Sequence, residues 1–272
     1  MHITNKISHY FEKFASYEFP HMIQSFINNT YVKTLGLDMS EFLNPSSYKT
    51  LNALFTRELI HPRDRDYDHS YDDFICVADS FITSQGKMSK DKALQIKGMS
   101  YSLDELLGEH VRQVHKDALY DGDFMNFYLS PKDYHRYHAP YNFNLHKLIH
   151  IPGKLYPVNF KYLNKQENLF IENERVIAEC RTMEGKYFYM VFVGALNVGK
   201  MVFNCEPQIE TNKDGSEIKV YEYVNNHIKK GDCMGYFKMG STVLVFWEKD
   251  MVELEDLENK KVRFSQTIAK AK

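Results

Sequence analysis

The most informative part of the sequence is residues 230–247, which read KGDCMGYFKMGSTVLVFW. Gly240 and Ser241 stand directly before the apolar run of residues 243–247, which predicts a buried strand. A serine in this position can attack the carbonyl carbon of the residue before it, and a glycine there has no side chain to block the approach. A glycine–serine pair is also typical of an ordinary turn before a strand. Considered alone, residues 240–241 therefore support two interpretations, a nucleophilic serine or a simple turn.

The composition indicates a folded protein with a substantial core. The chain has 272 residues, of which 43% are hydrophobic, so it can form one large domain or two small ones. Its formal net charge of -2 gives no reason to expect nucleic acid as a partner. The chain starts without the apolar core of a signal peptide, and no run of about 18 apolar residues is present. We therefore expect any contact with a membrane to be peripheral.

The cysteines are spread along the chain and indicate neither zinc nor redox chemistry. No C-x-x-C pair occurs, so the sequence predicts neither a zinc knuckle nor a thioredoxin-like motif. We expect reduced thiols in a cytosolic compartment. The four cysteines are Cys76, Cys180, Cys205 and Cys233.

The first 56 residues are predicted to be helical. Apolar side chains recur at helical spacing in residues 3–14, and again after Pro20, which suits the first turn of a second helix. Asn44 followed by Pro45 is typical of the start of a further helix. These amphipathic stripes have two possible uses: they could pack on the rest of the protein, or part of the first two helices could lie in a lipid headgroup layer.

From about residue 75 onward, the hydrophobic period shifts from that of helices to that of strands. Residues 57–75 are charged and turn-like, and we interpret them as a solvated connection. Strands without long intervening helices favour an α+β fold, with a mostly antiparallel β-sheet core and amphipathic helices segregated at the N-terminus. The predicted strands include residues 74–78, 124–129, 187–193 and 243–247, with an exposed hairpin arm at 217–223.

Two histidines and one carboxylate are the other candidates for chemistry. His135 and His138 lie in a segment bracketed by Pro131 and Pro140, and histidine is the side chain best suited to moving protons near neutral pH. A zinc site is a weak interpretation because the H-E-x-x-H pattern on a helix is absent, and two ordinary loop histidines are the simplest one. Asp79 follows an apolar strand, where a carboxylate is often only a turn or cap residue, but it could also orient a histidine.

The order of several motifs resembles the phosphatidylserine decarboxylase family. Residues 229–247 resemble its C-terminal signature, in which a Gly-Ser-Thr triplet is cut, and residues 128–140, YLSPKDYHRYHAP, resemble its D-Y-H-R-x-H-x-P motif. The remaining matches follow in order between about residue 50 and residue 247. They are residues 54–59 (F-F-x-R-x-L in the family), 77–87 (P-x-D-G…G-K), 96–103 (K-G-x-x-Y-S-L), 173–176 and 193–195.

Two positions depart from the family pattern. Ser80 stands where the family usually has glycine after the aspartate, and Ala139 stands where a methionine commonly follows the second histidine. The carboxylate of Asp79 and both histidines are retained. We therefore expect these changes to affect the turn and the packing rather than the chemistry.

The resemblance implies a proenzyme that processes itself. Asp79 orients His138, which removes the proton from Ser241, and the serine oxygen attacks the carbonyl of Gly240. The chain is then cut between residues 240 and 241, and Ser241 becomes a covalent pyruvoyl group; no metal is expected. The pyruvoyl ketone forms a Schiff base with phosphatidylserine and accepts the electrons left when CO2 departs. His135 is expected to act in this decarboxylation, which yields phosphatidylethanolamine.

The same resemblance implies an organisation and a location. Residues 1–56 form a helical segment that contacts the membrane, and residues 57–272 form the β-rich catalytic domain. The expected partners are phosphatidylserine in a membrane, the two fragments held together after the cut, and a second copy of the chain in a homodimer; no nucleic acid is expected. We expect a peripheral membrane protein on the cytoplasmic face of the cell membrane. Two alternatives stay open: a catalytically inactive lipid-binding homologue, and a pyruvoyl-dependent decarboxylase of a soluble amino acid.

Overall fold

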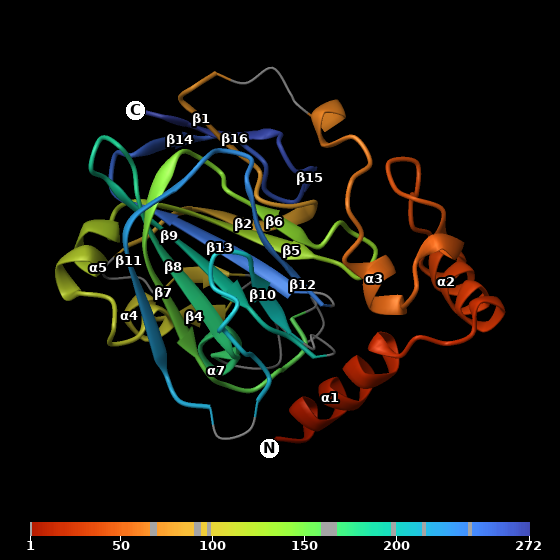
Figure 1. The fold of residues 1–272 in the computed structure, drawn as a ribbon. Coiled ribbons are helices and arrows are strands. Elements are labelled where there is room, and N and C mark those ends of the chain that lie inside the picture. Colours follow the sequence, from red (N-terminus) through yellow and green to blue (C-terminus); the bar gives the residue numbers. More distant parts are fainter. Residues whose placement is uncertain are drawn as a thin grey trace.

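An antiparallel sheet of eight strands forms the centre of the protein (Figure 1). The structure is a computed structural model that describes residues 2–65, 70–89, 94–96, 99–158, 168–196, 200–213, 216–238 and 241–272. From one edge of the sheet to the other, the strands are β11 (Lys219–Ile228), β7 (Phe143–Ile151), β8 (Arg175–Arg181), β9 (Tyr187–Val193), β13 (Ser241–Trp247), β5 (Asp123–Leu129), β2 (Ser80–Lys87) and β15 (Lys261–Val262).

Three smaller sheets accompany the large one, and every pairing between the described strands is antiparallel. This confirms the α+β class with a mostly antiparallel sheet core. The smaller sheets are β10 (Met201–Phe203), β12 (Cys233–Phe237) and β6 (Arg136–His138); β1 (Asp73–Ile75), β16 (Thr267–Ala271) and β14 (Val252–Leu254); and β3 (Leu94–Ile96) with β4 (Met99–Tyr101).

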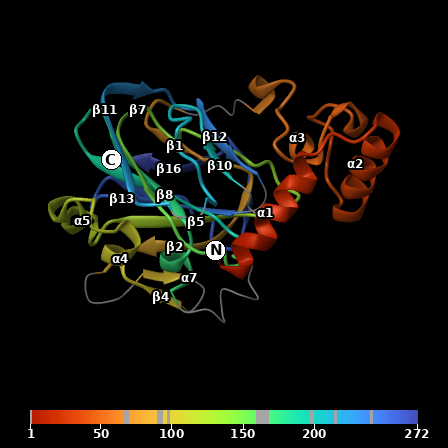
Figure 2. The same cartoon turned by 60° about the horizontal axis from the view of Figure 1, so that its bottom comes forward.

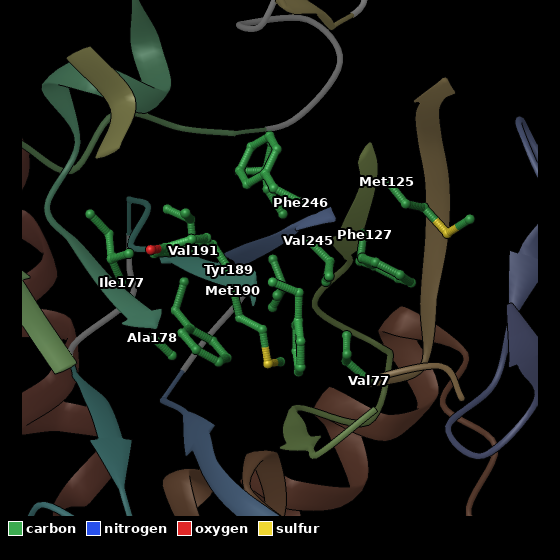
Figure 3. Packing of buried hydrophobic residues seen from close by; sticks show 14 of the residues in the cluster. Val77, Met125, Phe127, Ile177, Ala178, Tyr189, Met190, Val191, Val245 and Phe246 are labelled. Carbon is green, nitrogen blue, oxygen red and sulfur yellow. The ribbon is translucent and has the colours of Figure 1, made fainter. Parts of the chain in front are cut away.

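Strand β13 lies in the middle of the large sheet, between β9 and β5. All seven of its residues are buried. Figure 3 shows Val245 and Phe246 of β13 packed among side chains of neighbouring strands, including Met125 of β5 and Met190 of β9. A strand that is covered on both faces needs an apolar residue at nearly every position, which explains the uninterrupted run at the end of the 230–247 segment. The edge strand β11, by contrast, is mostly exposed.

The helices gather at two places around the sheets. Figures 1 and 2 show α1, α2 and α3 on one side of the strands and α4 and α5 on the opposite side. Ser102 caps α4, because its hydroxyl accepts a hydrogen bond from the amide of Glu105 at 3.3 Å. The helices are α1 (Ile3–Ser16), α2 (His21–Leu35), α3 (Leu51–Phe55), α4 (Leu103–Leu107), α5 (Gln113–Leu119) and α7 (Leu169–Glu172), with 3-10 turns η1 (Pro45–Ser47) and η2 (Pro62–Arg65).

The apolar stripes of the N-terminal helices are only half covered. Phe11 of α1 and Ile27 and Tyr31 of α2 pack against a small core that includes Leu54 of α3. The other apolar side chains of these helices face outward and are exposed. They are Ile3, Ile7, Tyr10 and Phe14 of α1, Tyr17 after it, and Met22, Ile23 and Phe26 of α2. No helix in the described part of the chain is long and apolar enough to span a bilayer.

The interpretation of residues 57–75 as a solvated connection is wrong at several positions, because Leu59, Asp73 and two arginines are buried. Arg57 and Arg65 are each only 3% exposed, because their guanidinium groups bond to partners in the interior. The strand predicted at residues 74–78 also ends earlier, at Ile75. After this strand, the carbonyl of Val77 accepts a hydrogen bond from the amide of His138 at 2.8 Å, so the backbone at Val77 binds the segment that carries the histidines.

Candidate active site

Ser241, the predicted nucleophile, is the first residue of β13 and is fully buried. It lies opposite Leu129, the last residue of β5. The Oγ atom of Ser241 has no hydrogen-bond partner among the described residues. A buried polar group without a partner costs about 1–3 kcal/mol, so such an atom in a folded protein calls for a functional explanation. Gly240, the other half of the predicted cleavage site, lies outside the described residues.

The backbone holds the two predicted histidines against the strand that leads to Ser241. A tight turn at residues 130–133 follows β5, and the chain then passes through His135 into β6, which ends at His138. Strand β6 pairs along β12. The carbonyl of His135 accepts from the amide of Phe237 at 3.0 Å, and Phe237 ends β12 shortly before Ser241.

His135 is an uncharged imidazole with a free acceptor nitrogen. Its Nδ1 donates to the carbonyl of Asp133 at 2.8 Å, so Nε2 carries the lone pair, and Nε2 has no partner among the described residues. The ring is fully buried and packs on Phe55, with 4.1 Å between centroids. Burial lowers the pKa of His135 to about 3, and the positive charge of Arg57 acts in the same direction. At neutral pH this residue is uncharged and its Nε2 is free to accept a hydrogen bond.

His138 is also neutral, but both of its ring nitrogens are engaged. Its Nδ1 donates to the carbonyl of Gly231 at 2.9 Å, and its Nε2 accepts from the hydroxyl of Tyr134 at 3.1 Å. The ring of Phe264 stacks on the imidazole with 3.7 Å between centroids. Burial lowers the pKa of His138 to about 4. The unprotonated Nε2 is the form that a general base needs, and the phenol of Tyr134 occupies it.

Asp79 precedes β2 and bonds to two groups other than a histidine. Its Oδ1 accepts from Nη1 of Arg65 at 2.5 Å and from the amide of Phe264 at 2.8 Å. The ring nitrogens of His138 bond to a carbonyl and a phenol, so in this structure Asp79 is linked to His138 only indirectly among the described residues. That link is Phe264, whose amide bonds to the carboxylate and whose ring lies on the imidazole.

The zinc interpretation has no matching set of ligands in the described part of the chain. Both histidines use Nδ1 as a donor to a backbone carbonyl. Among the described residues, no group of three or more His, Cys, Asp or Glu side chains is arranged to hold a metal ion.

Comparison with known proteins matches the sequence to one family over most of the chain. The profile of the phosphatidylserine decarboxylase family matches residues 51–270. The chain belongs to the phosphatidylserine decarboxylase family. A phosphatidylserine decarboxylase proenzyme of Helicobacter pylori (strain Shi470) is 43% identical over 98% of this chain and 97% of that protein. The corresponding proenzyme of Campylobacter jejuni is 39% identical over 99% of this chain and 100% of that protein, and that of Idiomarina loihiensis is 37% identical over 92% and 86%.

Within this phosphatidylserine decarboxylase fold, sequence reasoning missed three residues that hold the site together. Arg65 binds Asp79, and Tyr134 binds His138. Phe264 contacts Asp79 through its amide and His138 through its ring. Arg65 stands in an alternating run of charges, a pattern that is typical of exposed segments and gives no sign of burial. Tyr134 lies inside the histidine motif, and this position was the one signal that could have drawn attention to it.

Proposed function

We propose that the chain is a self-processing, pyruvoyl-dependent enzyme that converts phosphatidylserine to phosphatidylethanolamine and CO2. The observation that carries the proposal is the buried Oγ of Ser241 at the start of β13, which has no hydrogen-bond partner among the described residues. Two uncharged histidines lie on the segment that pairs with the strand before Ser241. The names of the related proteins supply the substrate and indicate synthesis as a precursor.

In the proposed cut, Nε2 of His138 takes the proton of Ser241 after the hydroxyl of Tyr134 has moved aside. The oxygen attacks the carbonyl carbon of Gly240, and the peptide bond becomes an ester. Elimination then breaks the ester, leaving a carboxylate on Gly240 and dehydroalanine at position 241. Water releases ammonia from this residue and leaves the pyruvoyl group. A serine hydroxyl is a poor nucleophile without a base, and such a base typically contributes about 10²–10⁴-fold in rate.

The surroundings of Ser241 suit a pyruvoyl group. The residue is fully buried, and the neutral imidazole of His135 offers an acceptor that no other described residue uses. The group supplies a carbonyl that draws off the electron pair left by the departing carboxylate. Asp79 and the backbone carbonyls of Asp133 and Gly231 keep the surrounding side chains in place. We assign His135 the role of holding or moving a proton at Nε2 during decarboxylation.

The sheet supports the idea that both fragments stay together after the cut. Strand β13 belongs to the C-terminal fragment and pairs on both sides with strands of the other fragment, β5 and β9. Strand β16 of the same fragment pairs with β1. Separation would expose a fully buried strand and break the ladders of β13 with β5 and β9, of β16 with β1 and of β15 with β2. A homodimer stays a prediction.

The exposed apolar side chains of α1 and α2 support peripheral binding to a membrane on its cytoplasmic face. Phe26 and Met22 are 71% and 85% exposed, and Tyr10 is 71% exposed. Amphipathic helices with such a face bind at the boundary between headgroups and acyl chains. This position would bring the lipid substrate to the helical side of the sheets.

Intact-mass spectrometry of the purified protein tests the proposal. We expect two fragments that end and begin at Gly240 and Ser241, the smaller one without a free amino terminus, and an uncut chain for Ser241→Ala. An inactive lipid-binding homologue would stay whole. A decarboxylase of a soluble amino acid would be cut in the same way, so CO2 release from phosphatidylserine vesicles must be compared with release from free serine.

A further inference from the structure

A cavity of about 280 Å³ lies between the N-terminal segment and the loops that carry the site residues. Gly36 and Phe42 line it from the N-terminal side, and Asp79 and Tyr134 line it from the side of the sheet. The hydroxyl of Tyr134 is the group that bonds to His138. The cavity is therefore enclosed in part by residues that contact the proposed catalytic groups.

Arg57 is one of the residues that line this cavity, and its guanidinium group is only partly satisfied. The side chain is 3% exposed. Its Nη2 donates to the carbonyls of Lys132 and Asp133, at 3.0 and 3.3 Å, whereas Nε and Nη1 have no partner among the described residues. The ring of Phe42 lies 4.5 Å from the guanidinium carbon. A buried cation with unused donors is costly unless an anion pairs with it.

The remaining charges of the cavity favour an incoming anion. Its acidic side chains already have donors: Glu41 bonds to Arg65 and Arg263, Asp79 to Arg65, Asp133 to Ser130, and Asp38 to the amide of Ser40. Lys132 and Lys261 also line the cavity, and neither makes an ion pair with another described residue. Within the described part of the chain, Arg57 and these two lysines thus form no ion pair.

We propose that this cavity binds the phosphodiester group of the phospholipid substrate, with Arg57, Lys132 and Lys261 as its cationic ligands. The inference rests on the proposed function and adds a recognition site to it. A planar guanidinium with two free donors matches phosphate oxygens well, and lysines contribute as point charges. The position of the cavity beside the N-terminal helices suits a headgroup that arrives from a membrane bound there.

The carboxylate of phosphatidylserine is a poorer occupant for a physical reason. Its negative charge disappears as CO2 leaves, so pairing it with a guanidinium would stabilise the substrate more than the transition state and slow the reaction. The phosphodiester keeps its charge throughout. Binding it lowers KM without raising the barrier, and it anchors the serine headgroup while the reaction takes place.

Steady-state kinetics with monomeric dihexanoyl-phosphatidylserine, below its micelle concentration, test the proposal without a membrane. For the double variant Lys132→Ala, Lys261→Ala we expect KM to rise roughly five- to thirtyfold, the effect of losing two exposed charge contacts, with a much smaller change in kcat. Lys270→Ala is the matched control, because this lysine is exposed on β16 away from the cavity and its removal should leave both constants unchanged.

Direct binding separates this site from the proposed activity. The uncut Ser241→Ala chain is titrated calorimetrically with glycerophosphoserine, inorganic phosphate and free serine, with and without Arg57→Gln. We expect glycerophosphoserine to bind and to lose affinity in Arg57→Gln, whose fold is checked by circular dichroism. If the chain with Ser241 intact releases no CO2 from phosphatidylserine while Ser241→Ala still binds glycerophosphoserine, the site stands although the proposed function fails. Three results would each overturn the site. The first is an unchanged KM in the double lysine variant. The others are binding of inorganic phosphate but not of glycerophosphoserine, and binding of free serine as tightly as glycerophosphoserine.

Discussion

Arg65 donates a hydrogen bond from Nη1 to Oδ1 of Asp79 at 2.5 Å. The same guanidinium forms a second, two-pronged contact with Glu41, which follows the N-terminal helices. The carboxylate proposed to take part in self-cleavage is therefore fixed by an arginine that also binds the N-terminal segment. Because Arg65 is 3% exposed and Asp79 is more accessible, the contact is shielded from water mainly on the arginine side.

Replacing Arg65 should weaken both the fold and the cut. In Arg65→Gln we expect the free energy of unfolding to fall by about 1–3 kcal/mol, the usual cost of removing a hydrogen bond to a charged group. Self-cleavage should slow as well, because Asp79 loses the donor that fixes it. Urea unfolding is measured on the uncut Ser241→Ala background, and cleavage by intact mass over time. Arg181→Gln is the control, since Arg181 is exposed at the end of β8; an equal loss in both variants would contradict the specific role.

The central part of this fold could be predicted from the sequence, because burial on both faces of a strand leaves an unmistakable apolar run. Residues 187–193 and 243–247 both proved to be central strands. The N-terminal helices could also be predicted, from the helical spacing of their apolar residues. The alternating charges near Arg65 carried no comparable signal, since a buried arginine is recognised only by the carboxylates that surround it in space.

The sequence identified the candidate site residues, but only the structure could show which groups they contact. The sequence led us to expect that Asp79 orients His138, but it gave no sign of Phe264, whose amide bonds to Asp79 and whose ring stacks on His138. A contact of this kind depends on how the last strands return to the sheet, which no local pattern encodes. The assignment of chemical roles to the four site residues stays a prediction.

Replacing each of the two histidines should affect a different reaction. His138→Ala should block the cut, because the proposed base for Ser241 is lost. His135→Ala should permit the cut and abolish CO2 release, because its free Nε2 is proposed to serve only the second reaction. Intact mass and CO2 release are measured on the same preparations. Loss of cutting in both variants would mean that the roles are divided wrongly.

Acid should destabilise the protein through its buried histidines. The folded pKa of His138 is about 4, below its ordinary value of 6.5, so between these values the unfolded chain binds more protons. Stability is therefore complete above about pH 7 and is lost as the pH falls from 6.5 toward 4, by up to about 3 kcal/mol for this residue. Urea unfolding of Ser241→Ala from pH 4 to 8 measures this slope. His138→Gln should flatten it; an unchanged slope would show that other groups cause the acid sensitivity.

A buried chain of polar groups next to the cleavage site should stabilise β13. The hydroxyl of Thr242 lies 2.8 Å from Oδ1 of Asn126, whose amide nitrogen donates to Thr83 on β2 at 2.6 Å. Thr242→Val removes the hydroxyl donor for Asn126, so we expect a loss of about 1–3 kcal/mol in urea unfolding. Thr182→Val is a matched control, because the buried hydroxyl of Thr182 has no partner among the described residues and its removal should be nearly neutral. Equal losses would show that the polar chain contributes nothing specific.

The exposed face of α1 and α2 should bind lipid vesicles through its apolar side chains. In the double variant Phe14→Ser, Phe26→Ser we expect vesicle binding to fall by roughly tenfold or more, because each phenylalanine contributes on the order of 1 kcal/mol when its exposed part enters the lipid boundary. Flotation with phosphatidylserine-containing vesicles measures this. Val224→Ser is the control, since Val224 is 90% exposed on the edge strand β11 instead of the N-terminal helices. CO2 release from monomeric dihexanoyl-phosphatidylserine should stay near the wild-type rate in the double variant, because the proposed chemistry takes place at β13 and would need the helices only to reach lipid in a membrane. A parallel loss with this monomeric substrate would mean that the helices shape the active site itself.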